Sequence, residues 1–477
     1  MVYKNELGLV IQATHGPLQQ RRGFLLSYNY FIKNIYIPWN FSGVLIKALP
    51  LFILIKTLKT LRLSSLSLSE KCLKQENQQE NNHAPTTLRR QKYLHYSIVL
   101  NILARLSVKS LLRFRCVCKS WDSLITSPYF ISTHLYINNV DRGDYIVNMP
   151  RYENPSSPPY SNRPVITLYR DHDGFDKIFE FEIPSRFPPY QANLVGSCNG
   201  LLCLEFRVRE ERWQAASTTA VIYLWNPSIR KLKRLPDIEF DYFIPLGFAY
   251  HSENNDCKVV KISYSRRMHE VEVYTSKSDS WRTLEGLDVP LGTKIEFGDN
   301  IFLPIPFFGG ALHWLVDIIQ SEEKHRTEMI LSFDVNNETF EELAVPDHCF
   351  DGAGNEFDMK CISLFRGKLA LIRFETVGEQ SFACVWAIKE YGNHKSWNKP
   401  LVVREQYDGL YVLTKRGFIL LEDESHNGQL EMPKKRKLVL IDPEARCEER
   451  FDFQDLSFVA TFMKSLALLD EANVITY

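Results

Sequence analysis

Histidine and cysteine, the side chains that most often bind metals or act as nucleophiles, are not spaced for either task in this chain. None of the 12 histidines belongs to an HExxH motif or to a paired-ligand spacing, and we interpret His313, beside Trp314 in a strand-like run, as structural. The ten cysteines form no CxxC pair. Cys116 and Cys118 are two residues apart in a helical pattern, so their side chains point in different directions. We therefore predict no metal site and expect reduced, mostly buried thiols.

Motifs of other enzyme classes are missing as well. The chain has no GxSxG, no P-loop and no GxGxxG. The run from Asp171 to Gly174 resembles the start of a calcium loop, but the closing glutamate of an EF-hand is absent and the surroundings are strand-like, which favours a hairpin turn. Carboxylates brought together from distant loops stay open as an option, although no pattern indicates them. The sequence thus predicts no catalytic residue and no cofactor.

A helical pattern dominates residues 94–135. Ile98, Ile102 and Leu106 are four residues apart, and further apolar residues follow three or four apart from Leu111 to Leu124. A segment of about 40 residues is too short to bury this much apolar surface by itself. We therefore expect it to complete its core against a partner protein. Ser127 and Pro128 have the residue types that begin one more short helix.

The run from Leu106 to Trp121, LSVKSLLRFRCVCKSW, resembles the plant form of the F-box nearly residue for residue. The F-box is the helical module through which substrate receptors dock onto the Skp adaptor of cullin-based ubiquitin ligases. The resemblance implies that part of the following set enters a groove of the adaptor: Leu94, Ile98, Ile102, Leu106, Val108, Leu111 and Leu112. We assign four further residues to the core of the module itself: Phe114, Val117, Trp121 and Leu124. The alternative is that the apolar stripe packs internally.

Two positions depart from the family pattern. His95 and Ser107 stand where the family usually has proline. The hydroxyl of Ser107 can still cap the next helix. Whether the two changes weaken adaptor binding is open at this stage.

After about residue 135 the pattern changes to short strands separated by polar turns. Each repeat of this pattern has two halves. The first half is an apolar strand that begins with glycine, as at Gly310–Leu315 and Gly367–Ile372, and the second half is a strand, a polar turn and another strand. The turns of the second half begin at Asn226, Thr275, Asp334, Ile388 and Asp442, which are 49, 59, 54 and 54 residues apart. This spacing is close to the roughly 50-residue repeat of kelch propellers. It predicts about six blades, one of them including 165–169 and 178–183, and a ring closed by a last strand from 457–468.

The run from Leu194 to Leu204, with LWNPS at 224–228, resembles the F-box-associated interaction domain of plant F-box/kelch-repeat proteins. Only one Gly-Gly pair is present, so the blades depart from true kelch repeats. The expected fold class is α+β multidomain, a small all-α F-box module followed by an all-β propeller-like domain of about six blades. The expected domains are an N-terminal extension of unknown structure at 1–74, a polar linker at 75–93, the F-box at 94–135 and the propeller at 136–470.

Charge is unevenly distributed along the chain. Residues 1–93 contain 13 Lys/Arg against 4 Asp/Glu, and the remainder contains 44 against 53. An acidic main body argues against nucleic acid as the principal ligand. The most apolar run, 43–55, is interrupted by Lys47 and Pro50 and is shorter than the roughly 20 residues that span a membrane, so we expect no stable membrane insertion. The basic run at 433–437 is either a nuclear import signal or a charged turn, and we expect a cytoplasmic location, a nuclear one or both.

The resemblance as a whole implies a non-catalytic substrate-recognition subunit of a Skp–cullin–F-box ubiquitin ligase. In this interpretation the F-box binds the Skp adaptor and through it cullin, while the propeller binds a target protein that other subunits ubiquitinate. Two alternatives are a propeller-fold carbohydrate-active enzyme with a helical appendage and an adaptor-binding scaffold that degrades nothing.

Overall fold

The computed structural model separates the chain into two compact units, Met1–Tyr93 and Leu94–Tyr477. In the first unit the structure describes one antiparallel pair, β1 (Val2–Lys4) with β2 (Val10–Gln12). In the second it describes residues 96–477 except 142–144, 151–164, 171–176, 189–191, 210–217, 241–245, 252–255, 266–267, 285–292, 299–302, 321–324, 347–359, 378–379, 406–408, 414–418, 425–435, 443–446, 453–455 and 470–472. The expected linker at 75–93, most of the N-terminal extension, Leu94 and His95 therefore lie outside the described residues. No described helix combines the length and the hydropathy that crossing a membrane requires.

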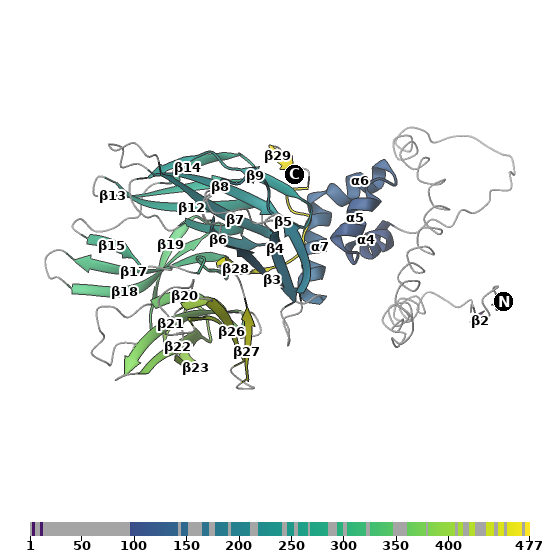
Figure 1. The fold of residues 1–477 in the computed structure, drawn as a ribbon. Coiled ribbons are helices and arrows are strands. Elements are labelled where there is room, and N and C mark those ends of the chain that lie inside the picture. Colours follow the sequence, from purple (N-terminus) through teal and green to yellow (C-terminus); the bar gives the residue numbers. More distant parts are fainter. Residues whose placement is uncertain are drawn as a thin grey trace, which may run out of the picture. The chain divides into compact units, whose positions relative to one another are not determined.

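Four helices open the second unit, coloured blue in Figure 1. They are α4 (Tyr96–Ala104), α5 (Val108–Phe114), α6 (Lys119–Thr126) and α7 (Pro128–Asp141). The expected caps are present, because the Ser107 hydroxyl accepts the Ser110 N–H at 3.3 Å and the Ser127 hydroxyl accepts the Phe130 N–H at 3.2 Å. The helix that begins after Ser127 is longer than expected, since it continues for 14 residues.

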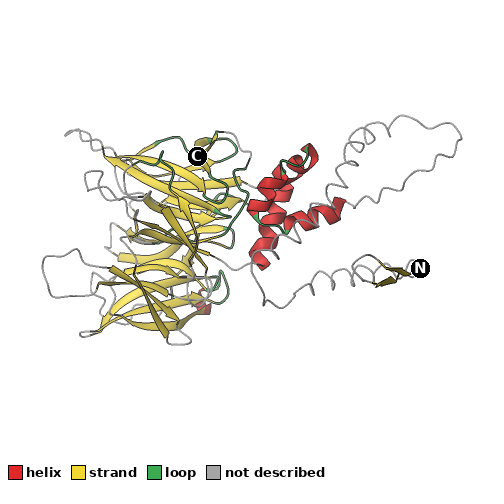
Figure 2. Cartoon of the chain, turned by 45° about the vertical axis from the view of Figure 1, so that its right-hand side comes forward, coloured by secondary structure: helices red, strands yellow, loops and turns green. Residues whose placement is uncertain are grey.

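Six antiparallel sheets follow, and each is one blade of a propeller (Figure 2, yellow). Blade 1 combines β28 (Leu456–Phe462), β3 (Tyr145–Pro150), β4 (Val165–Arg170) and β5 (Lys177–Glu182). Blade 2 combines β6 (Ala192–Cys198), β7 (Leu201–Arg209), β8 (Thr218–Asn226), β9 (Lys231–Arg234), β10 (Ile238–Phe240) and β29 (Val474–Thr476). Blade 3 combines β11 (Leu246–His251), β12 (Asp256–Ser265), β13 (Met268–Thr275) and β14 (Ser280–Leu284).

The second half of the ring has the same plan. Blade 4 combines β15 (Thr293–Phe297), β16 (Phe307–Phe308), β17 (Ala311–Gln320), β18 (His325–Asp334) and β19 (Thr339–Ala344). Blade 5 combines β20 (Lys360–Phe365), β21 (Lys368–Val377), β22 (Gln380–Ile388) and β23 (Trp397–Glu405), with the short 3-10 helix η3 (His394–Ser396) before β23. Blade 6 combines β24 (Gly409–Leu413), β25 (Ile419–Glu424), β26 (Arg436–Asp442) and β27 (Cys447–Asp452). The prediction of about six blades is confirmed.

The ring closes because its first and last long strands share a blade. β28 pairs with β3, with Phe462 opposite Tyr145, and β28 also lies against the innermost strands of blades 2 and 6. The strand expected from 457–468 therefore closes the ring as predicted. A second closure was not anticipated: β29 adds to the outer edge of blade 2, where Ile475 is opposite Leu232.

Backbone conformation explains the two repeating sequence patterns. The glycine-led strands follow two-residue hairpins, such as Asn199-Gly200 with φ of 52° and 77° and Arg366-Gly367 with φ of 51° and 70°. Left-handed conformation at both positions matches the right-handed twist of the paired strands, and glycine adopts it without strain. These hairpins and the turns between the third and fourth strands lie at one end of the strands, which we call the turn end. β3, the first strand after α7 in the chain, also begins there.

Neighbouring blades bury apolar faces against each other. Tyr274 of blade 3, for example, packs with Trp281 and with the faces of blade 2 that carry Leu201 and Ile222. Glycine permits the close approach of two blades, since a Cβ on Gly247 would lie 2.7 Å from Leu312. The core therefore lies between blades, and no single blade is complete by itself.

Candidate functional site

The apolar stripe predicted on the first helix lies largely outside the core of the helical module. On α4 the fully buried residues are Leu103 and Ala104, whereas Ile98 is 38% exposed and Tyr96 is 60% exposed. Ile102 is half-buried. Large apolar side chains on the exposed face of a short helix gain free energy when a partner covers them, by roughly 1.5–3 kcal/mol for a fully buried aliphatic side chain.

The second helix divides the predicted adaptor-binding set. Val108 and Leu111 are 5% and 0% exposed and face inward with Phe114. Their positions three residues apart place them on one helix face, and that face packs within the module. The structure therefore assigns Val108 and Leu111 to the module's own core, not to a surface that a partner can reach. Leu106 and Leu112 are half-buried.

Of the four residues expected in the module's core, Phe114 and Leu124 are buried and Val117 and Trp121 are half-buried, and the core also contains five residues that the sequence analysis missed. Phe114 and Trp121 meet edge to face with ring centroids 5.6 Å apart. The missed residues are Leu103, Ala104, Ile125, Phe130 and His134, each buried. The four-residue spacing from Phe130 to His134 was the available signal, but it falls in the helix that was expected to be short.

His134 connects the last helix to the first turn of the module. Its Nε2 lies 3.0 Å from the Leu106 carbonyl oxygen, and its ring stacks on Phe130. Arg115 and Asp122 add an ion pair of 2.6 Å between the end of α5 and α6. These contacts tie α5, α6 and α7 together, so the exposed face of α4 is presented by a packed scaffold.

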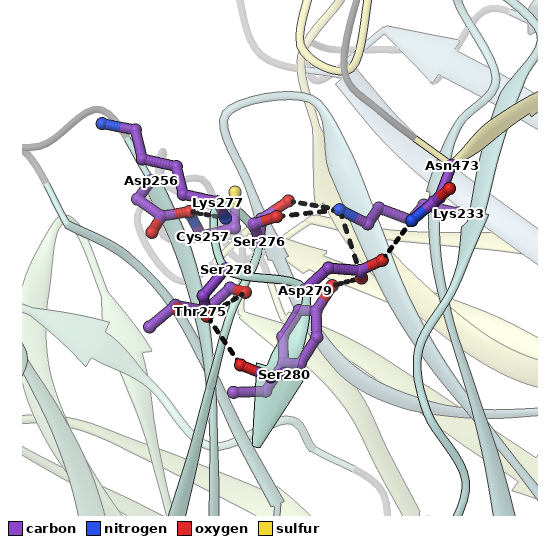
Figure 3. Close-up of polar contacts among 11 residues, drawn as sticks. Lys233, Asp256, Cys257, Thr275, Ser276, Lys277, Ser278, Asp279, Ser280 and Asn473 are labelled. Atoms are coloured by element: carbon purple, nitrogen blue, oxygen red, sulfur yellow. Dashed lines mark hydrogen bonds and ion pairs between the residues drawn. The ribbon is translucent and has the colours of Figure 1, made fainter. Parts of the chain in front are cut away.

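A polar network joins blades 2 and 3 at the turn end (Figure 3). Lys233 of β9 is almost fully buried, and its Nζ donates to the Ser276 carbonyl oxygen at 2.8 Å and lies 3.4 Å from Asp279. Tyr274 donates its hydroxyl to Asp279 at 2.7 Å, and Asn473 donates to the same carboxylate at 2.6 Å. The hydrogen bond from Tyr274 is the main reason that the pKa of Asp279 is lowered.

The same arrangement recurs between blades 3 and 4. Lys258 donates to the Val335 carbonyl oxygen at 2.6 Å and to Glu338 at 2.7 Å, and Arg282 also bonds to Glu338. Burial alone would raise the pKa of Glu338, but the hydrogen bonds from Arg282 and Lys258 lower it. Asp279 and Glu338 occupy the same turn position, each with positive φ. The recurrence indicates that these carboxylates join blades and do not form a catalytic pair.

His313 is likewise an element of packing. It is fully buried, its Nε2 lies 2.7 Å from the hydroxyl of Tyr391 in the next blade, and burial lowers its pKa to about 4. A histidine that stays neutral and bonded in this way is structural. Across the described residues, no three His, Cys, Asp or Glu side chains gather in a group that holds a metal ion.

Comparison with known proteins agrees with this two-part architecture. Residues 94–133 match the model of the F-box domain, and residues 172–467 match the model of the F-box associated beta propeller domain. An F-box/kelch-repeat protein of Arabidopsis thaliana is 30% identical over 356 residues, which cover 70% of this chain and 88% of that protein. The F-box protein CPR1 of the same organism is 27% identical over 331 residues, 65% of this chain and 72% of that protein. Among solved structures, TolB from Acinetobacter baumannii aligns with a TM-score of 0.38 at 10% identity, over 70% of this chain and 72% of that chain. Because the propeller model alone matches more than half of the residues, this chain belongs to the family of F-box proteins that carry an F-box associated beta propeller domain.

Proposed function

We propose that this protein is the substrate-recognition subunit of a Skp–cullin–F-box ubiquitin ligase. The observation that carries the proposal is the exposed apolar face of α4, centred on Ile98, on a helical module that matches the F-box. Burial removes Val108 and Leu111 from the predicted adaptor-binding set, which leaves Ile98, Ile102, Leu106 and Leu112 among the described residues. Leu94 stays a prediction. Full burial of four exposed aliphatic side chains would contribute roughly 6–12 kcal/mol, and these four contribute less because Ile102, Leu106 and Leu112 are already half-buried. The association cost is about 4–15 kcal/mol. Adaptor binding therefore needs contributions beyond these four residues.

The propeller holds the target protein in this proposal, and it does so at the end of the ring opposite the turn end. Two features support this placement. The first strand after the helical module, β3, begins at the turn end, and the C-terminal segment from Ser465 to Leu469 packs there, where Asn226 donates to the Ser465 and Ala467 carbonyl oxygens. The opposite end carries connections that differ in length from blade to blade, and such connections vary freely on a rigid scaffold.

The role of the chain in ubiquitin transfer is proximity and not chemistry. Among the described residues, the carboxylates with a lowered pKa, Asp279 and Glu338, serve contacts between blades. Holding a target near the conjugating enzyme raises the effective concentration of its lysines, which accelerates transfer without a catalytic residue on this chain. We place this activity in the cytoplasm, the nucleus or both, and a fluorescent fusion of the full chain distinguishes these locations.

Binding of the full chain to a purified Skp-family adaptor tests the proposal. We expect binding by the wild type and a loss of about tenfold or more in affinity for Ile98→Glu, because the exposed stripe then carries a charge into an apolar interface. Val402→Glu is the matched control, since Val402 is 50% exposed on β23 and lies outside the helical module. Absence of adaptor binding by the wild-type chain would contradict the proposal.

Target capture tests the second part of the proposal, that the propeller binds a target protein for ubiquitination. Proteins bound by the wild type and by Ile98→Glu are compared with the proteasome blocked. We expect the same targets on both, with ubiquitinated forms on the wild type only. Targets whose abundance does not change when the proteasome is blocked would indicate a scaffold that degrades nothing.

A further inference from the structure

The helical module carries exposed positive charge that its own residues do not neutralise. Lys109 and Arg113 are exposed on α5, and Lys119 is exposed at the first residue of α6. Asp122 is paired with Arg115, and the other acidic residue of the four helices, Asp141, is the last residue of α7. Within the part of the chain that the structure describes, none of Lys109, Arg113 and Lys119 forms an ion pair.

Helix stability does not explain two of these charges, Lys109 and Lys119. Lys109 and Arg113 are four residues apart on one face of α5, and like charges at this spacing destabilise a helix by a few tenths of a kcal/mol. Lys119 stands at the N-terminus of α6, where the helix dipole is positive and a cation is unfavourable. That end also lacks a side-chain cap, because Cys118 makes no capping hydrogen bond. Arg113 alone, in the last turn of α5, has a favourable position.

Locally unfavourable residues that stay exposed indicate a function outside the helix. Two of the cations lie next to an apolar residue proposed to meet the adaptor, since Leu112 follows Lys109 by three residues and precedes Arg113, and Lys119 begins the next helix. An apolar patch with a charged rim fits a partner whose apolar groove has a rim of opposite charge.

We propose that the exposed face of α5 and the start of α6 form a basic docking rim, Lys109, Arg113 and Lys119, that pairs with acidic side chains around the apolar groove of the Skp-family adaptor. The inference rests on the proposed function and adds the chemistry of the partner surface. Rim charges of this kind accelerate association and set its salt dependence more than they slow dissociation.

The test measures association and dissociation rates of the full chain with a purified Skp-family adaptor, from about 50 to about 400 mM NaCl. We expect the association rate of the wild type to fall as salt rises. Lys109→Glu, Arg113→Glu and Lys119→Glu should each lower that rate by about three- to tenfold at low salt and flatten its salt dependence, with little change in the dissociation rate. Lys109→Arg and Lys119→Arg should behave like the wild type.

Lys395→Glu is the matched control, because Lys395 is an exposed cation on η3 of the propeller and its charge lies outside the module. If the wild type binds the adaptor and the charge-reversal variants at Lys109, Arg113 and Lys119 behave like Lys395→Glu, the basic docking rim is wrong and the proposed function stands. No adaptor binding by the wild type would instead remove the proposed function itself. A fall in the urea midpoint of the free chain for all three reversals would assign the cations to contacts within this chain and would also overturn the inference.

Discussion

At the scale of single residues, neighbouring apolar side chains of the helical module have different tasks. Ile98 and Leu111 are both aliphatic and both belong to the same sequence-predicted set, yet Ile98 is 38% exposed and Leu111 is 0% exposed. The periodicity of the sequence shows that both lie on apolar helix faces. It does not show which face meets the other helices, because that depends on how the helices cross.

The two residues should therefore respond differently to truncation. Leu111→Ala should destabilise the helical module by about 2–5 kcal/mol, because it leaves a cavity in the core. Ile98→Ala should change stability by less than about 0.5 kcal/mol. Chemical unfolding of the two variants, followed by circular dichroism at 222 nm, measures the difference. Equal losses for the two variants would mean that α4 does not have the exposed face described.

A buried histidine should make the propeller sensitive to acid. The pKa of His313 is about 4 in the folded chain against 6.5 in its ordinary state, so the unfolded chain binds a proton that the folded chain does not. Stability from this residue is fully present above about pH 6.5 and is lost as pH falls toward 4, by roughly 3 kcal/mol in total.

Urea unfolding between about pH 7.5 and about pH 4.5 checks the direction of this pH dependence. As the pH falls over this range, the wild type should lose more stability than His313→Gln. The glutamine retains a side-chain acceptor for the Tyr391 hydroxyl. Parallel pH curves for the wild type and His313→Gln would show that His313 titrates normally in the folded state.

At the scale of elements, buried lysines determine how blades meet. Lys233 and Lys258 come from different strand positions, but each donates to a turn carbonyl oxygen and to the carboxylate at the same position of that turn. In the sequence the turns are recognisable from polar residues between apolar runs. The lysines cannot be recognised from the sequence as partners of these turns, because each lies 43 or more residues before the turn that it contacts.

Removal of one of these lysines should cost more than removal of an exposed one. Lys233→Ala should destabilise the chain by about 2–4 kcal/mol, because a turn carbonyl and a carboxylate that is only partly exposed lose their partner. Lys395→Ala, on the surface of the propeller, should change stability by less than about 0.5 kcal/mol. The midpoint of urea unfolding, followed by tryptophan fluorescence, compares the two. A Lys233→Ala effect no larger than that of Lys395→Ala would argue against the bridge between blades.

At the scale of the whole molecule, the ring is joined twice by its C-terminal residues. β28 completes blade 1, and β29 then adds to blade 2. The indole N–H of buried Trp225 donates to the Tyr477 hydroxyl at 2.7 Å, and burial raises the pKa of Tyr477 to about 12. Asn473 reaches Asp279 of blade 3, so the last five residues contact two blades.

Loss of this second closure should destabilise the propeller. Tyr477→Phe leaves the Trp225 N–H without its acceptor and should cost about 1–3 kcal/mol. Deletion of 473–477 should cost more, since it also removes β29 and the Asn473 hydrogen bond. Thermal unfolding measures both, with Tyr129→Phe on the exposed surface of α7 as the control. A deletion variant as stable as the wild type would show that β28 alone closes the ring.

The sequence by itself determined the local features of this protein. Helical periodicity indicated a helical module at 94–135, and the resemblance of the run from Leu106 to Trp121 indicated the F-box. Strand-turn-strand units whose turns begin 49 to 59 residues apart indicated about six blades. These features are readable because hydrogen-bonding period, capping and turn conformation depend on residues close together in the chain.

Only the tertiary structure decided which apolar residues stay exposed and how the blades connect. It assigned Val108 and Leu111 to the core and left Ile98 outside, and it brought Lys233 to Asp279 and Trp225 to Tyr477. Each of these outcomes depends on the packing of segments far apart in the sequence. Local patterns carry no information about that packing, because an apolar side chain has the same helical or strand period whether its face meets the protein's own core or a partner.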